Sequence, residues 1–181
     1  MYEVELKLRA DHDSLQEQLT EVGAERVDSR RQVDTYYDAP HRSFAETDEA
    51  LRIRREERAD GEGITKLTYK GPLVETASKT REEHETAVDD DDALQGVLAG
   101  LGFEPAATVE KKRVYYDFEG YTLVLDTVDG LGEFVEIERE VPEAEVAAAR
   151  TEAVDRLEQL GLDPDDQIRT SYLGLLLAAD S

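Results

Sequence analysis

The chain has 181 residues, of which 44 are acidic and 21 basic, giving a net charge of −23. It has no cysteine, which excludes disulfides and thiolate metal sites, and its acidity disfavours binding to the phosphates of nucleic acid. No apolar run approaches the roughly 20 residues of a membrane span, so we expect a soluble, cytoplasmic protein without membrane or nucleic-acid partners.

Apolar and polar residues alternate through most of the chain, a pattern typical of β-strands with one buried face. We expect strands, in chain order, at residues 2–10, 25–40, 49–58, 63–72, 80–88, 107–118, 121–132 and 133–141. We expect helices at 11–24, 92–101, 142–160 and 171–179. The short connections favour antiparallel pairing. The pattern predicts an α+β barrel, or a strongly curved sheet, in a single domain over residues 1–181.

The distribution of charge indicates the protein's setting. Acidic residues are dispersed along the chain, with one run at 89–92, and only six of the 21 basic residues are lysine. A dispersed acidic surface with few lysines suits molar salt, where the Debye length shrinks to about 3 Å. We therefore expect a halophile's protein, whose remaining lysines concentrate where a lysine is needed.

Charged residues recur on one face of most expected strands. The groups that share a face are Glu3/Glu5/Lys7, Arg52/Arg54, Lys66/Lys70, Arg81/Glu83/Glu85, Lys111/Arg113 and Glu136/Glu138, with Asp126 alone. For one strand, a solvated polar face is the simpler interpretation. That interpretation does not suit the whole set of strands, because the helices also need an apolar surface to pack on. A closed barrel with helices on its apolar outside would place the charges in its lumen.

The two signs of charge lie on different strands, which indicates a ligand. The first and last strands carry carboxylates, the ligands that a hard cation such as Mg²⁺ or Mn²⁺ prefers. The middle strands carry lysines and arginines, which would repel one another in a closed lumen unless a polyanion binds there. A small-molecule triphosphate that carries a chelated metal ion would suit both the carboxylates and the lysines and arginines.

Other chemistry has little support in the sequence. It contains neither a G-x-x-x-x-G-K-[ST] loop nor a G-x-G-x-x-G motif after a strand. Three scattered histidines are best interpreted as surface residues, and Ser171 has no His/Asp partners at a recognisable spacing. P-loop binding, Rossmann binding and a nucleophilic triad are therefore disfavoured.

Several motifs resemble, in order, the blocks of the CYTH superfamily of triphosphate tunnel metalloenzymes. They are EVELK, LRIR, TYKGP, TREEHE, VEKKRVYY, LVLDTVDGLGEFVEIE and RTSYLGLL. The resemblance covers nearly the whole chain and implies an eight-stranded antiparallel tunnel. It implies that Glu3, Glu5 and Glu136 hold the divalent metal, and that Glu138 supports them or binds a second ion.

The resemblance also assigns the remaining site residues. The implied triphosphate ligands are Lys7, Arg54, Lys70, Lys111 and Arg113, with Arg52, Lys66 and Arg81 as helpers. Asp126 would contact a metal-bound water or orient a basic residue, which makes the catalytic set Glu3, Glu5, Lys7, Asp126 and Glu136. Glu83 and Glu85 match family acids to which no role is assigned.

Two activities fit the resemblance. The blocks are most similar to class IV adenylyl cyclases, which convert ATP to cyclic AMP and pyrophosphate. The alternative is a triphosphatase acting on inorganic triphosphate, thiamine triphosphate or a nucleotide. A non-catalytic module that binds polyphosphate or nucleotide is a third hypothesis. The apolar helix at 171–179 predicts either a homodimer contact or a cover over the barrel end.

Overall fold

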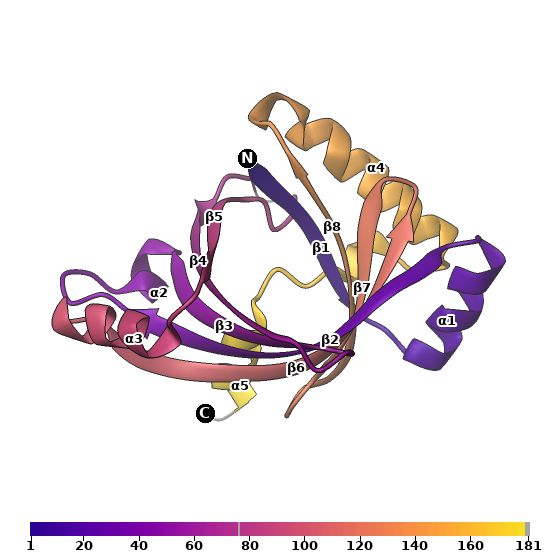
Figure 1. The fold of residues 1–181 in the computed structure, drawn as a ribbon. Coiled ribbons are helices and arrows are strands. Elements are labelled where there is room, and N and C mark those ends of the chain that lie inside the picture. Colours follow the sequence, from indigo (N-terminus) through magenta and orange to yellow (C-terminus); the bar gives the residue numbers. More distant parts are fainter. Residues whose placement is uncertain (76, 180–181) are drawn as a thin grey trace.

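The fold is a closed barrel of eight antiparallel strands with helices on its outside, as predicted (Figure 1). The computed structural model describes residues 1–75 and 77–179. Around the barrel the strands follow the order β1-β5-β4-β3-β2-β6-β7-β8. They are β1 (Tyr2–Arg9), β2 (Glu25–Asp38), β3 (Ala50–Arg58), β4 (Gly63–Leu73), β5 (Arg81–Val88), β6 (Glu104–Phe118), β7 (Tyr121–Val128) and β8 (Gly132–Val141).

The expected helices are present. They are α1 (His12–Glu21), α3 (Asp91–Gly100), α4 (Val146–Gln159), which follows the 3-10 turn η1 (Glu143–Glu145), and α5 (Tyr172–Ala179). The side chains of Asp11 and Asp90 accept backbone hydrogen bonds at the starts of α1 and α3, as N-caps do. The short helix α2 (Phe44–Thr47) and the 3-10 turn η2 (Pro164–Asp166) were not predicted, because so few residues show no helical period.

The largest apolar cluster lies outside the barrel wall, between the strands and helices α1 and α4 (Figure 1). Leu6 and Leu8 of β1 are buried there with Leu15 of α1 and Leu157 of α4. Burying one such leucine contributes about 1.5–3 kcal/mol. Because side chains alternate along a strand, this outward apolar face turns the charged face of β1 into the lumen.

Two smaller clusters place the other helices. Helix α3 covers the outside of β2, β3 and β4, where Leu98 packs in one cluster with Ile53 and Tyr37. Helix α5 packs on β6, and its Tyr172 lies against Phe134 at one end of the barrel. None of the helices in the described part of the chain has the length and apolar character needed to cross a bilayer.

The wall is closed least extensively between β1 and β5. Only Tyr2 and Glu3 pair there, with Glu82 and Arg81, whereas all of β1 from Tyr2 to Arg9 pairs with β8. Further along this seam, the loop between β4 and β5 takes over, because the Lys79 amide donates to the Glu5 carbonyl at 3.0 Å. A loop residue is therefore held in the barrel wall.

Candidate active site

A cavity of about 930 Å³ occupies the barrel. Most residues predicted to form the site line it, namely Glu3, Glu5, Arg52, Arg54, Lys66, Lys70, Arg81, Lys111, Arg113, Glu136 and Glu138. Lys7 and Asp126 are not part of this lining, since both side chains are fully buried behind it. The structure thus brings together residues from six strands that the sequence separates widely.

Three carboxylates form the first acidic group in the lumen. One oxygen each from Glu3, Glu5 and Glu138 lies within 4.8 Å of the others. No hydrogen bond or ion pair from residues 1–75 or 77–179 reaches the Glu138 carboxylate. Burial, together with the nearby Glu3, raises the pKa of Glu138 well above its ordinary value. Clustered oxygen donors, one of which has no ion-pair partner among the described residues, fit a hard divalent cation.

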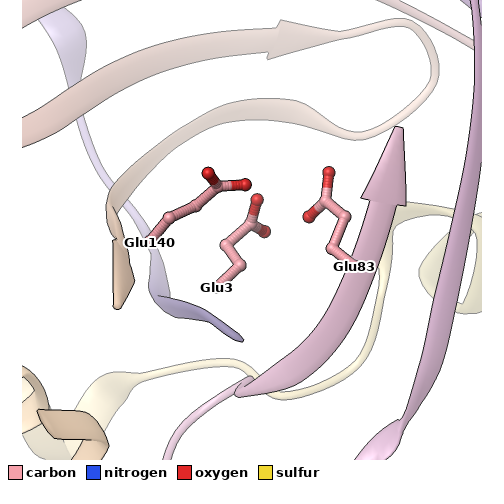
Figure 2. A group of neighbouring side chains, drawn as sticks. All are labelled: Glu3, Glu83 and Glu140. Carbon is pink, nitrogen blue, oxygen red and sulfur yellow. The ribbon is translucent and has the colours of Figure 1, made fainter. Parts of the chain in front are cut away.

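A second acidic group shares Glu3 with the first. Figure 2 shows the carboxylates of Glu3, Glu83 and Glu140 pointing toward a common space, and one oxygen from each lies within 4.8 Å of the others. Glu83, to which the sequence assigned no role, thus lies beside a predicted metal ligand. The Lys70 ammonium lies 3.0 Å from Glu3 and 3.5 Å from Glu83, and it partly neutralises this group.

Glu136 belongs to neither acidic group. Its Oε2 accepts a hydrogen bond from Nη2 of Arg113 at 2.6 Å, and Arg113 also binds both oxygens of Asp126, at 2.6 and 2.9 Å. Burial and Glu5 oppose ionisation of Glu136, but Arg113, Lys79 and Lys7 together hold its pKa below the ordinary value. Glu136 is therefore a carboxylate in an ion-pair network, and its role as a metal ligand stays a prediction.

Two cations of the lumen share one buried anion, Asp34 of β2. Arg54 donates to both oxygens of Asp34, at 2.7 and 2.8 Å, and the Lys111 ammonium lies 3.2 Å away. Burial raises the pKa of Asp34, yet Lys111 and Arg54 outweigh it and hold this pKa well below the ordinary value. Asp34 was not among the predicted site residues.

The cations nearest the open lumen are more loosely paired. Arg52 and Lys66 each lie 3.7 Å from Glu85, and Lys66 lies 3.7 Å from Glu56. The buried Nε of Arg52 has no hydrogen-bond partner among the residues that the structure describes. Loosely paired guanidinium and ammonium groups such as these can form short, charge-assisted hydrogen bonds to an anionic ligand without first breaking strong bonds to protein partners.

Arg81 is an exception among the predicted triphosphate ligands. It lies at the rim of the cavity, where its guanidinium binds the carbonyl and carboxylate oxygens of Asp48 and the carbonyl of Gly71. These bonds fix the start of β5 to the end of α2. Arg81 lines the cavity, but its donors have protein partners, and its role as a triphosphate ligand stays a prediction.

Lys7 is turned away from the cavity by the C-terminal segment. Its ammonium donates to the Thr170 carbonyl and lies 4.2 Å from the centre of the Tyr172 ring. Burial and the neighbouring Lys79 lower the pKa of Lys7 to about 7. Lys79 lines the cavity instead, with its ammonium 3.0 Å from Glu5.

Three site residues were missed for different reasons. Asp34 lies on a strand with charges on both faces, so its direction could not be sorted. Lys79 lies in a loop, which has no periodicity, although its being one of only six lysines was a signal. Tyr172, whose hydroxyl donates to Asp126 at 2.7 Å, begins a helix that is apolar all round and therefore gives no direction.

The CYTH domain family matches residues 1–172. A Methanocaldococcus jannaschii protein provisionally named an adenylate cyclase is 37% identical over 97% of this chain and 98% of its own length. A solved Pyrococcus horikoshii structure is 40% identical, with a TM-score of 0.91 over 98% of this chain and 99% of that one.

A more distant structure shares the fold. It is a Hippeastrum protein described as a provisional adenylyl cyclase with a dominant triphosphatase activity. It is 20% identical, with a TM-score of 0.67 over 98% of this chain and 95% of that one. The match over nearly the whole sequence, the relatives in the archaea and the charged eight-stranded barrel agree with one another, and this chain belongs to the CYTH family.

Proposed function

We propose that the protein is a metal-dependent adenylyl cyclase of the class IV type, which converts ATP to cyclic AMP and pyrophosphate. The observation that carries this proposal is the lumen, where a group of acidic oxygens lies next to loosely paired arginine and lysine side chains in one cavity. The name given to the Methanocaldococcus jannaschii relative supports the choice of reaction.

Glu3, Glu5 and Glu138 are the residues that would hold the divalent cation. Their oxygens lie close together, and Glu138 forms no ion pair within residues 1–75 and 77–179. When bound, Mg²⁺ or Mn²⁺ would polarise the phosphoryl oxygens and lower the pKa of the attacking hydroxyl. Glu83 and Glu140 add acidic oxygens on the far side of Glu3.

The cations of the lumen would bind and orient the triphosphate. Arg52, Lys66 and Lys70 line the cavity, where they can contact phosphate oxygens, and the Lys70 ammonium lies 3.0 Å from Glu3. In the reaction the ribose 3′-hydroxyl loses its proton to solvent water and its oxygen forms a bond to the α-phosphorus. The bond between that phosphorus and the α–β bridging oxygen breaks, and pyrophosphate leaves with that electron pair. Fixed positive charge on the leaving group stabilises the transition state without reorganisation of solvent.

A second candidate function is hydrolysis of a triphosphate. It uses the same cations and carboxylates, with water attacking the terminal phosphorus of inorganic triphosphate, thiamine triphosphate or a nucleotide. The observation in its favour is the description of the Hippeastrum protein, which shares this fold and is described as having a dominant triphosphatase activity.

Product analysis separates the hypotheses. Purified protein is incubated in high salt with Mg²⁺ or Mn²⁺ and, separately, with ATP, inorganic triphosphate and thiamine triphosphate. Cyclic AMP with pyrophosphate is the expected result. Orthophosphate would instead establish the triphosphatase, and tight binding without any product would establish a binding module.

A further inference from the structure

Residues 167–171, here called the strap, lead from η2 into α5 and belong to neither a helix nor a strand. They are part of the yellow trace that reaches α5 in Figure 1. The Ile168 amide donates to the Lys7 carbonyl of β1 at 2.6 Å. The Gln167 side-chain amide donates to the Ala77 carbonyl in the β4–β5 loop at 3.0 Å. The strap is therefore bound both to β1 and to the loop beside it.

The strap and α5 also hold the side chain of Lys7. The Lys7 ammonium donates to the Thr170 carbonyl and lies 4.2 Å from the centre of the Tyr172 ring. The Lys111 ammonium lies 5.2 Å from the centre of the same ring, so a second cation is close. Lys7 is fully buried, and no ion pair reaches it from the part of the chain that the structure describes. A buried charge without a counter-ion is costly, and a carbonyl and a ring compensate it only in part.

The backbone of Lys7 nevertheless belongs to the lumen face of β1. Lys7 lies between the outward residues Leu6 and Leu8, and it pairs with Glu136, which lines the cavity. A lysine has a flexible four-carbon stem, so rotation about its side-chain bonds can move the ammonium from the strap into the cavity while β1 stays in place. The contact with the strap therefore keeps a predicted triphosphate ligand out of the cavity.

We propose that the strap is an autoinhibitory contact, which holds Lys7 at Thr170 until a triphosphate binds and takes the lysine over. Phosphate oxygens supply the negative charge that the Thr170 carbonyl lacks, and charge-assisted hydrogen bonds are about twice as strong as neutral ones. The inference rests on the proposed function only for its ligand, a triphosphate, and it applies to the cyclase and to the triphosphatase alike.

Autoinhibition predicts the sign of the effect when the strap is weakened. If Lys7 reaches the cavity in only a fraction of the molecules, the apparent Kd is the intrinsic Kd divided by that fraction. A weaker strap increases the fraction and so strengthens triphosphate binding. Damage to an ordinary part of a binding site would weaken it.

The experiment weakens each attachment of the strap in turn. Gln167→Ala removes the hydrogen bond to Ala77, and Ile168→Pro removes the amide that donates to Lys7. Gln167 has φ −59° and ψ 143°, the extended conformation that suits a residue before proline. The matched control is Gln95→Ala, because the Gln95 side-chain amide also donates one bond, to Asp91 at 3.1 Å, but on α3 outside the barrel.

Equilibrium binding is measured in high salt with Mg²⁺ and inorganic diimidotriphosphate, a triphosphate whose nitrogen bridges resist cleavage. We expect Gln167→Ala and Ile168→Pro to bind it about two- to tenfold more tightly, which corresponds to the contribution of one hydrogen bond. Gln95→Ala should bind it as the wild type does. Weaker or unchanged binding in both strap variants would overturn the inference.

A double-mutant cycle tests whether the effect passes through Lys7. In a Lys7→Met background, Gln167→Ala should no longer change the affinity for diimidotriphosphate. If the gain in affinity persists without the Lys7 ammonium, the strap does not act by holding Lys7, and the inference fails.

A measurement on the wild type needs no variant. Hydrogen exchange of the Ile168 amide is followed with and without diimidotriphosphate. Transfer of Lys7 to the ligand removes a contact that holds the strap, so this amide should exchange faster in the complex. Unchanged or slower exchange would contradict the release of the strap.

These outcomes are independent of the reaction. If the strap variants bind more tightly through Lys7 but the wild type forms no cyclic AMP, the cyclase proposal fails and the autoinhibitory contact stands. If the wild type forms cyclic AMP but the strap variants bind as the wild type does, the autoinhibitory contact fails and the cyclase proposal stands.

Discussion

Arg113 and Glu136 are joined within the barrel wall by a 2.6 Å hydrogen bond, and each side chain is only 6% exposed. On the same face of β8, Glu138 has no such partner within the described chain. Two carboxylates with the same direction on one strand therefore have different electrostatic surroundings. Glu136 is held as an anion by a buried guanidinium, whereas burial and the nearby Glu3 raise the pKa of Glu138 well above its ordinary value despite the charge of Arg113.

Glu138→Gln should weaken metal binding and strengthen the metal-free fold. Glu138 lies directly opposite Glu5 in the β1–β8 ladder. Removing one of two facing like charges should raise the free energy of unfolding by about 0.5–1 kcal/mol. Apparent metal affinity should fall by about tenfold or more. Calorimetric titration with Mn²⁺ and urea unfolding check both effects, with the exposed Glu143→Gln as control. Unchanged metal affinity would refute the assignment of Glu138 as a ligand.

Asp34→Asn should destabilise the protein strongly at neutral pH, because it leaves Arg54 and Lys111 buried without their shared anion. Removing one partner of a buried ion pair costs about 3–5 kcal/mol. The pKa of Asp34 is lowered in the folded state, so its contribution is complete above the unfolded value of about 3.9 and is lost as the pH falls through the folded value.

Urea unfolding between pH 7 and pH 3 measures this pH dependence. The difference in unfolding free energy between the wild type and Asp34→Asn should be constant near neutrality and shrink in acid, below about pH 4. Added inorganic triphosphate should stabilise the variant more than the wild type, since it supplies the missing negative charge. A gap that grows in acid would contradict the ion-pair interpretation.

Lys79→Ala should alter metal and substrate binding in opposite directions. Lys79 lies 3.0 Å from Glu5, so its removal takes away a cation that competes with the metal for this carboxylate. We expect the Mg²⁺ concentration for half-maximal activity to fall and the KM for the triphosphate to rise. Lys112→Ala is the matched control, because Lys112 lies on the exposed face of β6. If both constants rise together, Lys79 does not modulate Glu5.

Tyr172→Phe should lower kcat by about tenfold and change KM little. Loss of a group that positions an active-site side chain commonly has an effect of this size. The variant keeps the ring against Lys7 but loses the 2.7 Å bond to Asp126, the partner of Arg113. Tyr121→Phe is the control, since it also loses a buried 2.7 Å hydroxyl bond, to the Ala149 carbonyl outside the lumen. Each should cost about 1 kcal/mol of stability. Equal kcat in both variants would assign Tyr172 a structural role only.

Much of the fold could be predicted because alternation was strong where one face packs under helices. In β1 the apolar side chains Leu6 and Leu8 lie under α1 and α4, and the charges alternate with them. The same contrast on β3, β4, β6 and β8 determined which residues share the lumen. Closure of the barrel could be predicted because the helices need an apolar outer face to pack on, which leaves the lumen for the charged side chains.

The remaining site residues depend on tertiary structure. The inward face of β2 carries Gln32, Asp34 and Tyr36, and its outward face also carries the charged Arg31, so alternation does not separate the faces. Lys79 enters the lumen because its loop pairs with β1, and Tyr172 does so because the chain returns past Lys7. Neither contact has a local sequence signal, since each joins segments far apart in the chain.

The short β1–β5 seam has a mechanical consequence. A ring under radial load opens where the fewest bonds cross it, and within residues 1–75 and 77–179 the backbone pairing at this seam consists of two residue pairs and one loop amide. Widening the lumen at this point would separate the Lys79 loop from β1 and draw its ammonium away from Glu5. The diameter of the barrel and the net charge inside its lumen are therefore coupled through the β1–β5 seam, where the Lys79 loop is bound to β1.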